Sequence, residues 1–65
     1  MEIDVMSNRD YVQIEVQIAG NWQSASSTLN DPQIYLAEMK SVQKLYPGLP
    51  RVRTMDSDNR LLDML

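Results

Sequence analysis

The sequence contains no cysteine and no histidine. The chain therefore has no thiolate or imidazole nucleophile, no Ser–His or Cys–His catalytic pair, and no zinc site of the common ligand types. It also has only two glycines, too few for a glycine-rich phosphate loop. We predict a protein that is not an enzyme, and we expect neither a cofactor nor a metal site.

Long apolar runs are absent as well. No segment approaches the roughly 18 apolar residues that a membrane span needs, and the stretch from Met1 to Met6 is acidic and lacks the apolar centre of a secretory signal. The net charge of −3 argues mildly against a protein that binds nucleic acid through electrostatics. We expect a cytoplasmic protein, and the lack of cysteine agrees with a reducing compartment.

The 65 residues predict a single domain over residues 1–65. A core of this size rarely supplies more than about 3–5 kcal/mol of net stability. Without disulfides, stability must come from packing alone or from packing together with a second subunit, so a homodimer is an attractive arrangement.

Period-two alternation runs from Tyr11 to Ile18, where valine and isoleucine alternate with polar residues. This pattern predicts a strand with one buried face. Gly20-Asn21 is expected to form a type II′ hairpin turn. The next segment, Trp22 to Thr28, is polar and predicts an edge strand.

The hairpin register decides where Trp22 lies. A two-residue turn would place Trp22 opposite Ala19 and turn its ring to the face away from the valines. A three-residue loop would place Trp22 opposite Ile18 and bury the ring. The second arrangement, with Trp22 in the core or at its edge, is favoured because the largest side chain of a small domain usually fills space.

A helix is predicted from Pro32 to about Tyr46, with Asp31 as its cap. Its apolar stripe consists of Tyr35, Met39, Val42 and Tyr46, with Ile34 and Leu45 widening it. Leu36 points away from this stripe and could form a partner contact. Glu38 falls within the apolar arc, from which it would reach solvent or pair with Arg51 or Arg53.

Pro47 and Gly48 are expected to end the helix. A strand then follows over Arg51–Met55, a turn over Asp56–Asn59 and a last strand over Arg60–Leu65. Residues 1–8 would form a partly ordered tail or an extra strand. The predicted fold is thus α+β, with the order β-β-α-β-β and one helix packed on one face of an antiparallel sheet.

Candidate functional residues lie on the strands. Arg51 and Arg53 share a face with Met55, where they would either grip a carboxylate or phosphate or pair with nearby acids. Asp56–Asn59 looks like the start of a calcium loop, but Leu61 stands where that loop needs glycine, which favours a plain turn. The candidate interaction surface comprises Tyr11, Glu15, Trp22, Leu36, Arg51, Arg53 and Arg60.

Three stretches carry a resemblance: Gly20 to Ser26, Tyr46 to Arg53, and Asp56 to Asp63. Together they resemble short open reading frames of tailed bacteriophages and prophages, which often show a tryptophan after a tight turn, a helix and a "YP…VR…D…GRLID" ending. Asn59 stands here where glycine is common in those frames. The resemblance covers about half of the chain, and it implies a small accessory protein made in a bacterial cell.

Three functions remain open at this point. The first is a non-enzymatic interaction protein, phage- or prophage-encoded, that binds a bacterial or phage protein and could inhibit it through its acidic groups, which are Glu2, Asp4, Asp10, Glu15, Asp56, Asp58 and Asp63. The second is a single-stranded nucleic-acid-binding module that uses Trp22, Tyr11 and the arginines. The third is a self-associating structural protein that pairs through an edge strand.

Overall fold

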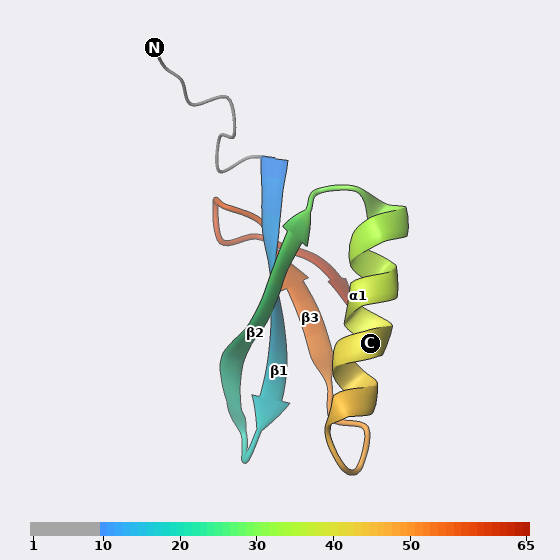
Figure 1. Ribbon diagram of the computed structural model, residues 1–65. Helices are drawn as coiled ribbons and strands as arrows, with labels where there is room; N and C mark the ends of the chain where they lie inside the picture. Colours follow the sequence, from blue (N-terminus) through green and yellow to red (C-terminus); the bar gives the residue numbers. More distant parts are fainter. Residues whose placement is uncertain (1–9) are drawn as a thin grey trace.

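The computed structural model describes residues 10–65, so the prediction for residues 1–8 lies outside the described part of the chain. Four strands and one helix follow one another as β1 (Tyr11–Ile18), β2 (Asn21–Leu29), α1 (Pro32–Leu45), β3 (Val52–Met55) and β4 (Leu61–Met64). The strands form one antiparallel sheet in the order β2-β1-β3-β4. Figure 1 shows α1 lying along one face of this sheet. The predicted α+β fold is confirmed.

The core lies between α1 and the two central strands. Buried side chains of β1 and β3 meet three buried side chains of the helix, and the cluster comprises Val12, Ile14, Val16, Val52, Tyr35, Met39 and Val42. Every second side chain of β1 belongs to this cluster, as is expected for a strand with one buried face. The prediction that one helix covers the valine and isoleucine stripe is confirmed.

The β1–β2 turn differs from the predicted one. Ile18 pairs with Asn21, so the two turn residues are Ala19 and Gly20 rather than Gly20 and Asn21. Both have positive φ, 52° and 82°, which is the pattern of a type I′ turn and not of type II′. The twist of a type I′ turn matches the right-handed twist of the two strands. Ala19 therefore adopts a left-handed conformation that alanine disfavours.

Because Ala19 is strained in this way, we expect Ala19→Asn to stabilise the protein by about 0.5–1 kcal/mol, since asparagine tolerates a left-handed backbone in a type I′ turn. Urea unfolding followed by circular dichroism measures the change. Ala19→Val is the matched control, and it should destabilise because a β-branched residue is a poor fit at positive φ. Equal urea midpoints for wild type, Ala19→Asn and Ala19→Val would contradict the positive φ of Ala19 in this turn.

A β-bulge interrupts the pairing of β1 with β2. Ile14 pairs with Ser26 and Glu15 pairs with Ser24, so Ala25 is an extra residue in β2. The alternation of β2 changes phase at this point. Ser26, beyond the bulge, lies on the same face as Ile14, whereas Trp22, before it, pairs with Gln17 and lies on the opposite face. The favoured placement of Trp22 in the core is therefore wrong.

Helix α1 begins as predicted. The Asp31 side chain accepts a hydrogen bond of 3.0 Å from the Gln33 backbone N–H, and Pro32 occupies the first turn. The helix ends one residue earlier than predicted, because Tyr46 is an extended cap. Leu45 is 77% exposed, so its predicted place in the apolar stripe is wrong.

Two further helix predictions are wrong in the same region. Ile34 is 39% exposed and does not widen the buried stripe. Leu36, which was expected to point away from the core, is half-buried and packs against it. The buried arc of α1 is thus rotated toward the β3 side, although α1 contacts β1, β2 and β3.

Candidate interaction surface

We call the sheet face opposite α1 the open face. The pairing register assigns its residues on the three strands β1, β2 and β3, because directly opposed residues in an antiparallel sheet project to the same side. Gln13 pairs with Ser27 and Met55, Glu15 pairs with Ser24 and Arg53, and Gln17 pairs with Trp22. On these three strands the open face thus comprises Tyr11, Gln13, Glu15, Gln17, Trp22, Ser24, Ser27, Leu29, Arg53 and Met55.

Three of these side chains form a stacked group. The Arg53 guanidinium carbon lies 4.2 Å from the centroid of the Trp22 ring. Arg53 Nε donates a hydrogen bond of 2.7 Å to Glu15 Oε1. The three residues come from three neighbouring strands, β2, β1 and β3, so the fold brings together what the sequence separates.

In this arrangement the positive charge of Arg53 is paired with the carboxylate of Glu15. The side chains of Arg53 and Glu15 are 26% and 23% exposed, and a half-exposed ion pair of this kind contributes at most about 1 kcal/mol. The contact with the Trp22 ring adds about 0.5–1 kcal/mol. Of the two predictions for the arginines, pairing with a nearby acid is confirmed for Arg53.

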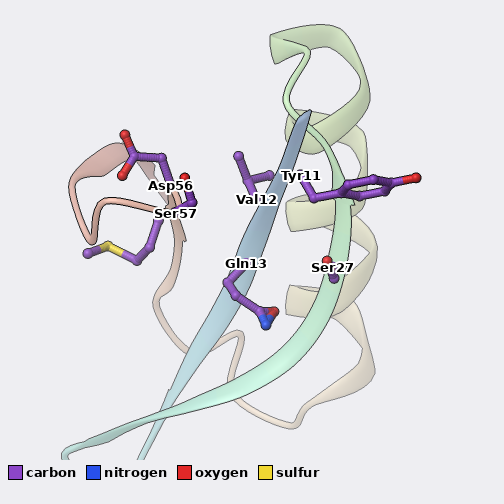
Figure 2. Close-up of a pocket in the computed structure, with 7 residues that line it drawn as sticks. Tyr11, Val12, Gln13, Ser27, Asp56 and Ser57 are labelled. Atoms are coloured by element: carbon purple, nitrogen blue, oxygen red, sulfur yellow. The ribbon is translucent and has the colours of Figure 1, made fainter. Parts of the chain in front are cut away.

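An open pocket of about 240 Å³ lies at one end of the open face. Its lining comes from β1, β2 and the β3–β4 turn and consists of Tyr11, Val12, Gln13, Ser27, Met55, Asp56 and Ser57. Figure 2 shows Gln13 and Ser27 on the two hairpin strands and Asp56 and Ser57 on the other side of β1. The volume falls below the 300–1,000 Å³ that is usual for small-molecule sites. It is large enough for a side chain of a protein partner.

Asp56 organises the turn at this end. Its Oδ1 accepts hydrogen bonds from the backbone N–H groups of Asp58 and Arg60, at 2.9 and 2.8 Å. Asn59 adopts φ 64°, and its N–H donates to the Asp56 carbonyl. The predicted plain turn over Asp56–Asn59 is confirmed. The hydrogen bond from the Arg60 backbone is the main cause that lowers the pKa of Asp56 from its usual value of 3.8, with the Asp58 N–H and the Arg60 charge adding to it.

A lowered pKa means that ionised Asp56 stabilises the fold above the unfolded pKa and that this contribution is lost as the pH falls through the folded value. We expect Asp56→Asn to be less stable than wild type at pH 7, and the difference should shrink as the pH falls below about 4. Urea unfolding at a series of pH values measures it. Asp58→Asn, whose carboxylate accepts only from the Arg60 side chain, is the control. A gap that stays constant with pH would contradict the argument.

Of the other predicted site residues, Arg60 and Leu36 do not join the open-face group. Arg60 is held by Asp56 and Asp58 at 3.2 Å each, within the turn. Arg51 lies opposite Gln17, whose N–H donates to the Arg51 carbonyl, so it extends the open face, and its exposed side chain approaches the Met64 sulfur at 2.9 Å. Leu36 lies on the helix, against the core.

Glu38 bonds neither of the two arginines proposed for it. Its Oε2 accepts a hydrogen bond of 2.6 Å from Ser26 Oγ, which links α1 to the edge strand β2. The predicted pairing with Arg51 or Arg53 is therefore wrong.

The pocket residues Gln13 and Ser27 were missed by the sequence prediction. The alternation of β1 does place Gln13 beside Tyr11, but no sequence signal places Ser27 there, because its face depends on the bulge.

Searches of family models, of curated proteins and of solved structures gave no match to this chain. Within residues 10–65, no helix combines the length and the apolar content that a membrane crossing requires.

Proposed function

We propose that this chain is a small non-enzymatic interaction protein that binds a protein partner through its open face. The observation that carries the proposal is the composition of that face, which displays Tyr11, Trp22, Arg53 and Met55 on a sheet surface that α1 does not cover. Aromatic residues, methionine and arginine are the types enriched in protein interfaces, and tryptophan, tyrosine and arginine dominate their energetic centres.

The charges of the same face favour a protein over a nucleic acid. A phosphate-binding surface needs unpaired cations. On the open face Arg53 is neutralised by Glu15, and in the adjoining turn Arg60 is held by Asp56 and Asp58, so that Arg51 alone of these three arginines has no acidic partner among residues 10–65. The Trp22 ring already carries the Arg53 guanidinium on one side, which leaves less aromatic surface for a stacked base.

The pocket supplies an anchoring position beside this group. Its lining combines the apolar side chain of Met55 with the polar ones of Gln13, Ser27 and Ser57. A partner side chain with an aliphatic stem and a polar end suits such a lining. The resemblance to phage reading frames makes a bacterial protein the expected partner, and occupation of its surface would inhibit it.

The test compares matched variants as baits in a bacterial lysate. Trp22→Ala and Met55→Gln alter the open face, whereas Lys40→Ala alters an exposed position on the helix. A genuine partner is retained by wild type and by Lys40→Ala and lost with the other two. With the purified partner, Trp22→Ala should weaken binding by about 30-fold or more, the effect of removing an interface centre worth about 2 kcal/mol. Equal retention by all four baits would refute the proposal.

A second measurement separates the nucleic-acid alternative. Trp22 is the only tryptophan, so its fluorescence reports directly on the open face. The proposal expects unchanged emission when a single-stranded oligonucleotide is added at low salt. Quenching that weakens steeply with salt would replace the proposal with a nucleic-acid-binding module.

A further inference from the structure

Strand β2 is an edge of the sheet and has β1 as its sole neighbour within the described part of the chain. It spans nine residues, Asn21–Leu29, with no charged residue and no proline. Natural edge strands usually block pairing with another chain by means of lysine, proline or short length. Apart from the bulge at Ala25, β2 has none of these protections, in contrast to the four-residue β4 at the other edge.

A flank of α1 lies on the same side of the molecule as this edge. The hydrogen bond from Ser26 to Glu38 shows which side of the helix faces β2. At 100° per residue, the exposed residues next to Glu38 on that side are Ile34, Ala37, Ser41 and Leu45, which we call the helix flank. Ile34 is 39% exposed and Leu45 is 77% exposed. Lys40 and Lys44 lie further round the helix, away from β2.

We propose that a second copy of this chain pairs with β2, antiparallel and across a two-fold axis normal to the sheet. The pairing joins the two four-stranded sheets into one continuous sheet and places both helices on the same face. Four strand positions, β1-β2-β2-β1, put the two β1 strands about 14 Å apart. A helix with its side chains is about 10–12 Å wide, so two helices that lie over the β1 strands face each other across a gap of only about 2–4 Å between the helix flanks.

The unpaired edge of β2 and the exposed helix flank of α1 lie on the same side, and together they indicate that the partner at β2 is a second copy of this chain. An extended peptide added to β2 would satisfy the strand edge but would leave Ile34 and Leu45 exposed. A second copy brings its own flank, and because the helices run antiparallel, Ile34 of one copy lies near Leu45 of the other. The uncharged β2 opposes no like charges when it pairs with itself. Glu38, the one carboxylate within α1, is already bonded to Ser26.

This inference goes beyond the proposed function, since it concerns the edge of the sheet and one side of α1. The open face stays uncovered in the pair, so either proposal can fail while the other stands.

The test is sedimentation velocity of the full chain from about 1 to 500 μM. We expect a dimer for wild type and at least a 10-fold weaker dimer for Leu45→Lys, whose position is exposed and tolerates lysine without loss of the fold. Leu61→Lys, at a 53% exposed position of the opposite edge strand β4, is the matched control and should remain dimeric. A wild-type monomer at every concentration would overturn the inference. So would a dimer that Leu61→Lys dissociates and Leu45→Lys does not, or one that neither variant weakens.

Crosslinking checks the geometry independently, because the chain has no cysteine of its own. Ser41 lies near the middle of the flank and therefore near the proposed axis. Ser41→Cys should form a covalent dimer with a short thiol-to-thiol crosslinker that spans the gap between the two helix flanks, and Lys40→Cys, on the other side of the helix, should not. Equal crosslinking of the two variants would count against the axis.

Discussion

Met39→Ala is expected to unfold most of the protein at 25 °C. Met39 is fully buried, with 0% of its surface exposed, and it sits between α1 and the sheet in the middle of the core cluster. Truncation of a buried methionine to alanine costs about 2–5 kcal/mol. That loss is comparable with the about 3–5 kcal/mol of net stability that a core of this size supplies. Far-ultraviolet circular dichroism and urea unfolding measure the effect.

Two variants make this expectation specific. Met39→Leu keeps the volume and the apolar character of the site and should cost less than about 1.5 kcal/mol. Lys40→Ala changes the neighbouring exposed residue and should leave the unfolding midpoint near that of wild type. A Met39→Ala protein with a cooperative transition at the wild-type midpoint would show that the core does not depend on this contact.

Thr54→Val is expected to have the opposite effect and to stabilise the protein by about 1–2 kcal/mol. Thr54 is 0% exposed on the helix side of β3, and its Oγ1 has no hydrogen-bond partner among residues 10–65. Burial of a hydroxyl without a partner costs about 1–3 kcal/mol, and valine fills nearly the same space without that cost. Both residues are β-branched, so the preference for a strand is unchanged.

Thermal unfolding measures this gain, and about 4–8 °C is expected for each kcal/mol in a domain of this size. Thr28→Val is the control, because Thr28 is only half-buried on the edge strand β2. A lower melting temperature for Thr54→Val would mean that the Thr54 hydroxyl makes a favourable interaction inside the core.

The elements themselves could be predicted from the sequence because their signals are local. Alternation over Tyr11–Ile18 defined β1, and Asp31-Pro32 defined the start of α1. The later strands differ from their predictions by one residue at each changed boundary, with β3 over Val52–Met55 and β4 over Leu61–Met64. Such differences are usual where strand ends fray.

The side-chain placements could be predicted less well because they depend on tertiary contacts. Leu36 and Leu45 exchange roles relative to the prediction, since the helical wheel does not say where α1 sits across the sheet. A proline favours an extended backbone at the residue before it, yet Leu49, which precedes Pro50, has φ 47°, because the short connection from α1 to β3 must reverse direction. Gln43 holds that connection by donating a hydrogen bond of 2.9 Å to the Pro50 carbonyl.

The candidate surface could be predicted only in part. The residues Tyr11, Glu15, Trp22 and Arg53 were named from the sequence, and all four lie on the open face. Their grouping into a Trp22–Arg53–Glu15 stack required knowledge that β1 lies between β2 and β3 in the sheet.

The bulge at Ala25 makes β2 tolerant of a change in chain length. The bulge takes up one extra residue, so the side chains on its two sides keep their faces although the alternation of the sequence changes phase there. A relative that lacked Ala25 but kept the register beyond it would still pair Ser24 with Glu15 and Trp22 with Gln17, now in a regular ladder. Loss of this single codon would thus leave the aromatic group on display.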